Sequence, residues 1–164
     1  MRKRGEAVFE LKTGDIIPGI GIGPFKLGAN ESTIFQISPD FSVREPCEGC
    51  RIYAGKDIMI WVDTENGKID QILVKDPFQG KLLGRFGIGT FFREIEEYLN
   101  EKVKVESEIT CVYEFPSLPG VSFELEDVDV PDDVLIANPY EELAPIECIS
   151  VYLPRQKDDS YSSF

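Results

Sequence analysis

The chain has 164 residues, of which 30 are acidic and 17 are basic, so its net charge is −13. The hydrophobic fraction of 42% predicts one domain with a buried core, and histidine is absent, which excludes His-based triads, Cys-His dyads and metal sites with a histidine ligand. The acidity disfavours nucleic acid or an anionic membrane as a partner and favours a protein with positive charge.

The first half of the chain predicts a short helix and several strands. The helix is expected near residues 31–38, where Asn30 or Ser32 can cap it and Pro39 follows it. Asn66-Gly67 predicts a hairpin, because both residues tolerate positive φ. Strands are expected at 7–11, 51–54, 57–63 and 68–75, and a glycine-rich stretch spans 18–24.

The second half predicts the same order of elements. A helix is expected over 91–101, with Thr90 as its cap. Its apolar face is expected to carry Phe92, Ile95, Tyr98 and Leu99. Strands are expected at about 108–115, 121–128 and 147–153, with a long acidic loop at 129–145 and a flexible tail at 155–164.

Short patterns suggest that the two halves are tandem repeats. Phe25, Leu27, Gly28 and Ile34 recur 61 residues later as Phe86, Ile88, Gly89 and Ile95. Ile69, Ile72 and Val74 recur 77 residues later as Ile146, Ile149 and Val151, so the second copy carries an insertion of 77 − 61 = 16 residues. Chance similarity is the alternative for patterns this short. The sequence thus predicts an α+β fold in which two helix-plus-antiparallel-strand repeats form one mostly antiparallel sheet with short helices packed on it.

The expected domain spans residues 1–154, with repeat one at about 16–76 and repeat two at about 80–154. The aromatic-x-aliphatic-Gly step before each helix is similar to that of the β-lactamase inhibitory protein family, which is also built from two repeats. The chain also resembles the immunity proteins of contact-dependent and other polymorphic toxin systems in its size, acidity and lack of catalytic residues. That resemblance implies binding and neutralisation of a cognate bacterial toxin, without catalysis or a cofactor.

Acidic residues concentrate near the predicted insertion. Residues 101–164 carry 15 acidic and 4 basic residues, against 15 and 13 in residues 1–100. A solvated loop would explain such a run, but the asymmetry favours a surface that meets positive charge, such as the phosphate-binding cleft of a nuclease toxin. The residues predicted to bind the partner, with Tyr140 as an aromatic anchor, are Glu124, Glu126, Asp127, Asp129, Asp132, Asp133, Tyr140, Glu141 and Glu142.

Other functions are less well supported by the residues. Cys47 and Cys50 form a C-x-x-C pair that suggests a small metal or redox protein, but Cys111 and Cys148 stand alone and are expected to be buried. The remaining alternatives are a binding or assembly module outside any toxin system and a mimic of DNA. No catalytic residue, metal site or cofactor is expected.

No apolar run has the length of a signal peptide or a membrane span, so a cytoplasmic protein is expected.

Overall fold

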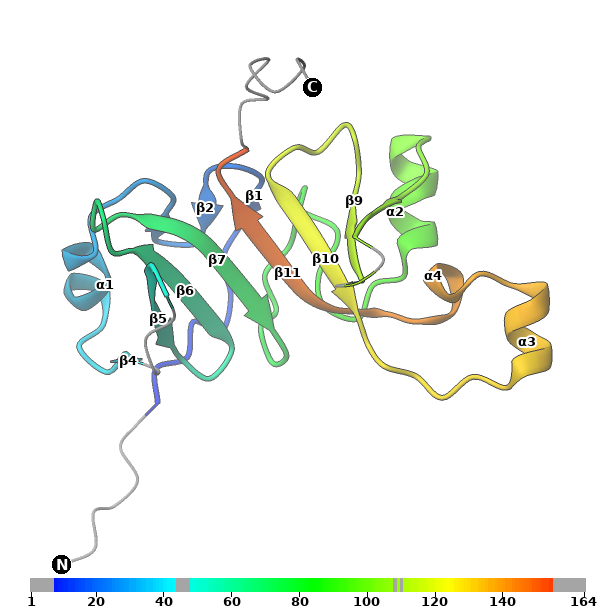
Figure 1. Ribbon diagram of the computed structural model, residues 1–164, viewed down its shortest axis with the longest axis horizontal. Coiled ribbons are helices and arrows are strands. Elements are labelled where there is room, and N and C mark those ends of the chain that lie inside the picture. Colours follow the sequence, from blue (N-terminus) through cyan, green and yellow to red (C-terminus); the bar gives the residue numbers. More distant parts are fainter. Residues whose placement is uncertain (1–7, 44–47, 108, 110, 155–164) are drawn as a thin grey trace, which may run out of the picture.

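A computed structural model of the chain describes residues 8–43, 48–107, 109 and 111–154. These residues form an α+β fold with antiparallel sheets and short helices, as the sequence predicts (Figure 1). The helices are α1 (Ser32–Ile37), α2 (Phe92–Leu99), α3 (Asp132–Ala137) and α4 (Tyr140–Leu143). The expected tail at 155–164 lies outside the described residues.

The strands form two sheets, not the single sheet that the sequence predicts. The small sheet has the order β1-β2-β3, with β1 (Ile16–Ile17), β2 (Gly21–Ile22) and β3 (Phe25–Lys26). The large sheet has eight strands in the order β4-β5-β6-β7-β11-β10-β9-β8. Its strands are β4 (Ser42–Val43), β5 (Cys50–Ala54), β6 (Ile58–Asp63), β7 (Ile69–Lys75), β8 (Lys104–Ser107), β9 (Val112–Glu114), β10 (Val121–Leu125) and β11 (Ile146–Tyr152).

The centre of the large sheet is the antiparallel pair β7 and β11. Leu73 lies opposite Ser150 in this pair, with Ile72 opposite Val151 on one side and Val74 opposite Ile149 on the other. From this centre, β6, β5 and β4 continue outwards in one direction and β10, β9 and β8 in the other. A helix precedes each set of strands in the chain, α1 before β4 and α2 before β8.

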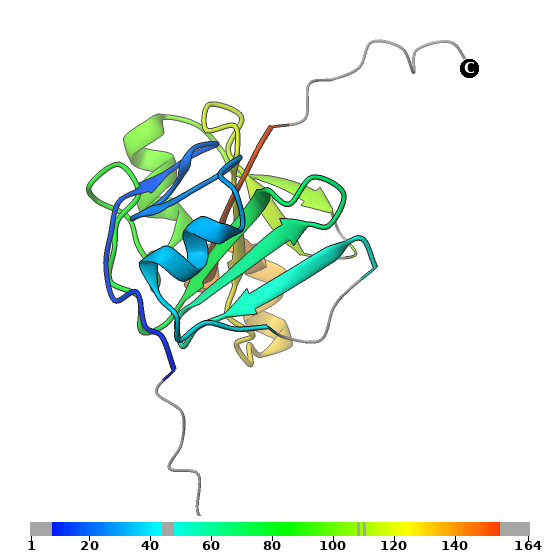
Figure 2. The same cartoon turned by 90° about the vertical axis from the view of Figure 1, so that its left-hand side faces the viewer.

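One face of the large sheet holds the core. Along β6, Ile58, Ile60 and Val62 are fully buried and alternate with half-buried residues, as expected for a strand with one covered face. Both α1 and the small sheet lie over this face, while none of the helices in the described part of the chain covers the opposite face (Figure 2). On α2, Phe92 and Ile95 are buried against the same core, as the predicted apolar stripe requires, but Tyr98 of that stripe is 51% exposed.

The structure corrects several predicted elements. Residues 8–11 form no strand. Thr90 does not cap α2, because its Oγ1 accepts a hydrogen bond from the Gly87 amide at 3.1 Å. Instead, the Glu94 carboxylate accepts from the Phe91 amide at 3.0 Å. The predicted loop at 129–145 contains α3 and α4, and β4 and β8 add edge strands that the sequence pattern did not indicate.

A buried carboxylate holds the segment before the small sheet. Asp57 is fully buried immediately before β6, and its two oxygens accept from the backbone amides of Leu11 and Lys12 at 2.8 and 2.9 Å. The sequence predicts a strand at residues 7–11. Here the Asp57 side chain, and not a neighbouring strand, satisfies the backbone amides of Leu11 and Lys12.

Candidate protein-binding surface

The chain between β10 and β11 leaves the sheet and forms a projection, here called the acidic arm (residues 126–145). It carries α3 and α4 and extends away from the sheet at the right of Figure 1. Its two ends meet at the sheet, where the Glu126 amide donates to the Pro145 carbonyl at 2.9 Å. The acidic loop predicted at 129–145 makes up most of this projection.

Tyr140 braces the base of the acidic arm. Its hydroxyl donates to the Glu126 carbonyl at 2.6 Å and accepts from the Val128 amide at 3.0 Å. The side chain is half-buried. The residue predicted as an aromatic anchor for a partner thus bonds within the chain and fixes where the arm leaves β10.

The outer part of the acidic arm is almost entirely in contact with solvent. Helix α3 buries no residue, and the side chain of Ile136 is 88% exposed beside Leu135, which is 39% exposed. Asp132 and Asp133 occupy the first turn of this helix, where carboxylates interact favourably with its dipole. The arm therefore presents apolar and acidic side chains together, a combination typical of protein-binding surfaces.

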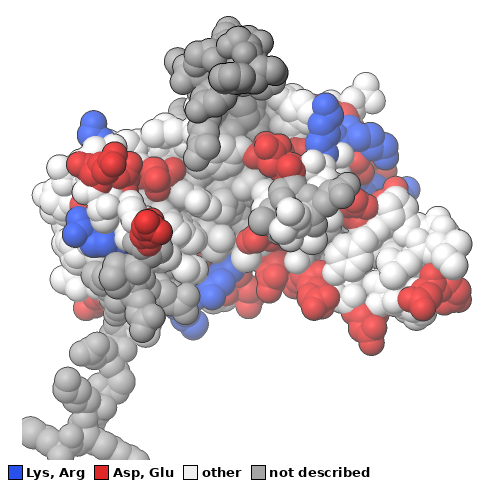
Figure 3. Space-filling view, viewed as in Figure 1, with Lys and Arg blue, Asp and Glu red and all other residues white. Residues whose placement is uncertain are grey.

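The predicted partner-binding residues divide into three places. Asp127 and Asp129 are exposed on the arm, like the two aspartates of α3. Glu124 lies on β10, opposite Cys148 of β11. Glu141 is half-buried on α4, whereas Glu142 is exposed there. The acidic side chains continue along the lower right edge of the molecule, from the sheet to the arm (Figure 3).

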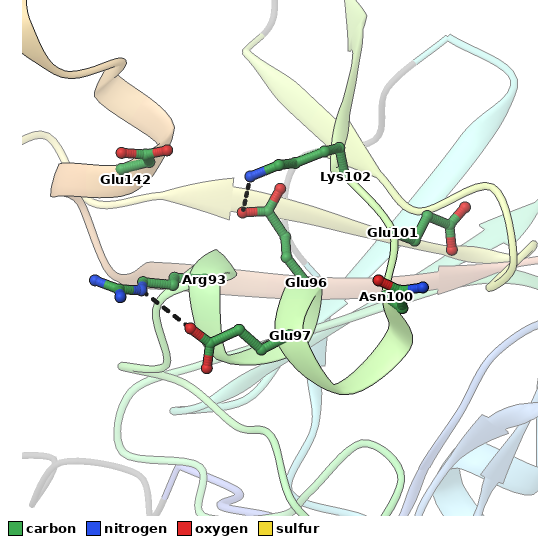
Figure 4. Close-up of a pocket in the computed structure, with 7 residues that line it drawn as sticks. All are labelled: Arg93, Glu96, Glu97, Asn100, Glu101, Lys102 and Glu142. Carbon is green, nitrogen blue, oxygen red and sulfur yellow. Dashed lines mark hydrogen bonds and ion pairs between the residues drawn. The ribbon is translucent and has the colours of Figure 1, made fainter.

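A pocket of about 410 Å³ lies between α2 and α4, and Glu142 points toward it from α4 (Figure 4). Most other charged groups of this pocket already have partners in the chain. Arg93 Nε lies 3.1 Å from the Glu97 carboxylate, and Lys102 Nζ lies 3.7 Å from that of Glu96. Both ion pairs lie within α2 or join it to the residues that follow it, so these charges are already paired within the chain.

A second acidic group was missed by the sequence analysis. It consists of Asp70 on β7, Glu106 on β8 and Glu114 on β9, which line one groove on the uncovered face of the large sheet. These residues are far apart in the sequence, so no local run of charge marks them. The available signal was the alternation along β9, where Glu114 follows the buried Tyr113 and so points to the opposite face.

The cysteines do not form a common site in the described part of the chain. Cys111 is exposed, which corrects the expectation that it is buried, and Cys148 is half-buried. Burial, followed by the nearby charge of Glu124, raises the pKa of the Cys148 thiol to about 12, so it is protonated and unreactive at neutral pH. Cys50 is disulfide-bonded, and Cys47 lies outside the described residues.

Among the described residues, no group of three or more Cys, Asp or Glu side chains is arranged to hold a metal ion. In the same part of the chain, no helix has the length and apolar character needed to span a bilayer. No protein-family model matches the chain, and neither a curated protein nor a solved structure is significantly similar to it.

Proposed function

We propose that this protein is an immunity protein, which binds a bacterial toxin with a basic surface and blocks the toxin's active site or substrate cleft. The observation that carries this proposal is the acidic arm, where the exposed Leu135 and Ile136 lie on the same projection as four exposed aspartates. The protein would act by covering the toxin, so it needs no catalytic group, metal or cofactor.

The charge of the arm suits a basic cleft. A nuclease binds phosphates through lysine and arginine, and opposite potentials on two proteins accelerate their encounter. The four aspartates supply this attraction, and they are Asp127, Asp129, Asp132 and Asp133. Leu135 and Ile136 supply apolar area that loses contact with water when a partner covers it.

Hydrogen bonds within the chain hold the base of the arm in place before binding. The hydrogen bonds of Tyr140 to Glu126 and Val128 fix the start of the arm before a partner arrives. Fixing the arm in advance reduces the conformational entropy that binding removes. Tyr140 therefore contributes as a brace for the arm, and the contacts to the toxin come from α3 and the residues before it.

We further infer that the domain consists of two tandem repeats, at about 16–76 and 80–154. Hydrogen bonds at equivalent positions support this inference. The Gly28 amide donates to the Ile69 carbonyl at 2.7 Å, and the Gly89 amide donates to the Ile146 carbonyl at 2.8 Å. In the first repeat, a short turn joins β6 to β7; in the second, the acidic arm joins β10 to β11. An insertion in one copy is a common place for a specific function.

The test is co-expression with the product of the adjacent reading frame in the cytoplasm, where immunity would be needed. We expect that product to arrest growth alone, and we expect this protein to co-purify with it and restore growth. Four substitutions in the arm, Asp127→Asn, Asp129→Asn, Asp132→Asn and Asp133→Asn, should weaken protection and leave the melting temperature within a few degrees.

The matched control removes four exposed carboxylates outside the arm, through Asp15→Asn, Asp40→Asn, Glu48→Gln and Glu65→Gln. This control changes the net charge equally and should retain protection. Equal loss in both variants would assign the effect to net charge, and loss in neither would place the interface outside the arm. A neighbour that is neither toxic nor bound would contradict the immunity proposal.

A further inference from the structure

The uncovered face of the eight-stranded sheet has side chains suited to contact with a protein. Trp61, Gln71 and Tyr152 lie in one row across β6, β7 and β11, as successive register partners. Met59 and Leu73 lie in the neighbouring row, and all five side chains are half-buried. Helix α1 and the small sheet lie on the other side (Figure 2), so no described helix covers this face.

A groove of about 860 Å³ opens on this face where β11 ends. Tyr152 lies along it, and three strands contribute carboxylates: Asp70 comes from β7 and, beyond β11 and β10, Glu114 comes from β9 and Glu106 from β8. No Lys or Arg among the described residues lines the groove. Lys104 is opposite Glu114 in register, but it is exposed and takes part in none of the four ion pairs within the described part of the chain.

None of the ion pairs found among the described residues involves a carboxylate of this groove. Burial raises the pKa of Glu114, and the charge of Glu106 raises it further, although the Tyr152 hydroxyl donates to the Glu114 carboxylate. Partial loss of hydration raises the pKa of Asp70, and the charge of Asp63 adds to this effect. A cation placed among these groups would stabilise their ionised forms.

We propose that this groove receives a lysine or arginine side chain from an extended basic segment of the protein partner. The inference rests on the proposed function and deepens it, because the groove becomes a second contact with the same partner. Trp61 and Tyr152 provide aromatic area next to the carboxylates, and aromatic residues are enriched where interfaces bind most strongly.

The positions of the two surfaces fit one partner. The acidic arm joins the start of β11, and the groove lies at its end. The seven residues of β11 separate them by about 20 Å, given a rise of about 3.4 Å per residue. A standard protein interface covers about 800 Å² on each partner, which is large enough to reach both surfaces.

The test uses a short acetylated peptide that alternates arginine and valine, and the same peptide with neutral citrulline in place of arginine. Trp61 is the only tryptophan in the chain, so its emission reports directly on this face. We expect the arginine peptide to change this emission saturably. The citrulline peptide should bind at least about tenfold more weakly, as expected when a paired charge is removed.

Two variants of equal charge separate the groove from the arm. The groove variant carries Asp70→Asn, Glu106→Gln and Glu114→Gln, and the arm variant carries Asp127→Asn, Asp129→Asn and Asp132→Asn. We expect the groove variant to lose at least about tenfold in peptide affinity and the arm variant less than about threefold. Circular dichroism checks the fold, and Glu106→Gln alone, at an exposed position, provides a milder variant.

Several outcomes would overturn the inference. Equal losses in both variants would indicate general attraction by net charge, and equal binding of both peptides would remove the role of the cation. Binding that appears only after Arg155→Gln and Lys157→Gln would assign the groove to the chain's own terminal segment.

If the groove variant still neutralises the toxin fully, the groove inference fails while the immunity proposal stands. If peptide binding depends on the groove but the product of the adjacent reading frame is not toxic, the immunity proposal fails and the groove remains a site for a basic segment.

Discussion

At the scale of single residues, two carboxylates illustrate opposite effects of burial. Asp57 is fully buried but accepts two backbone hydrogen bonds, so its charge is well solvated by the protein. Glu114 is half-buried beside another carboxylate, and its pKa is raised. The first arrangement stabilises the fold, whereas the second weakens it in exchange for a site that attracts positive charge.

We predict that Asp57→Ala lowers the free energy of unfolding by about 3 kcal/mol, because it leaves the amides of Leu11 and Lys12 without their acceptor. Urea unfolding followed by circular dichroism measures this change. Asp40→Ala, at an exposed position, is the control and should change stability little. Equal effects of the two substitutions would show that the amides of residues 11 and 12 find other acceptors.

Glu114 gives the protein a predictable dependence on pH. Because its pKa is raised on folding, the folded state binds more protons than the unfolded state, and stability falls as pH rises from the usual carboxyl range through the raised pKa. Glu114→Gln should therefore raise the melting temperature at pH 7 and have little effect at pH 4. Glu65→Gln, on the turn between β6 and β7, is the control. A stabilisation that is the same at both pH values would contradict this account.

At the scale of elements, Tyr140 braces the base of the acidic arm. Tyr140→Phe keeps the ring but removes a hydroxyl that bonds two backbone groups, so we expect a loss of about 1 kcal/mol in local stability. Hydrogen exchange at the Val128 amide should become faster, while exchange in β7 should stay unchanged. Tyr98→Phe on α2, where the ring is exposed, is the matched control. Unchanged exchange at Val128 would show that the arm is held by other contacts.

The elements also show what a sequence can predict. The hairpin at Asn66-Gly67 and the helices near 32 and 92 follow from local patterns, and the structure confirms them. The small helices of the arm lack such patterns because they bury no residue. The edge strands β4 and β8 are short, and tertiary pairing decides their structure. The run of acidic residues was visible in the sequence. The groove was not visible, because its three carboxylates are far apart in the sequence. They line one groove only after β7, β8 and β9 have joined the same sheet.

At the scale of the whole molecule, charge and shape are distributed unequally over the two halves of a balanced sheet. β7 and β11 form its centre, with three strands on either side, yet the second half carries the acidic arm and most of the negative charge. The arm and all of the groove except Asp70 and Gln71 of β7 therefore belong to the half with net charge −11, which comes from 4 basic and 15 acidic residues in 101–164. A basic partner would be attracted to this half before any contact forms.

This attraction predicts how salt affects association. Raising NaCl from about 0.05 M to about 0.5 M shortens the Debye length severalfold, so the association rate constant with the partner should fall by about tenfold or more. The dissociation rate constant should change less, because Leu135 and Ile136 contribute apolar contact that salt does not screen. Stopped-flow mixing of the two proteins measures both constants. If salt instead changes mainly dissociation, close ion pairs rather than long-range attraction dominate, and the groove contributes more than the arm.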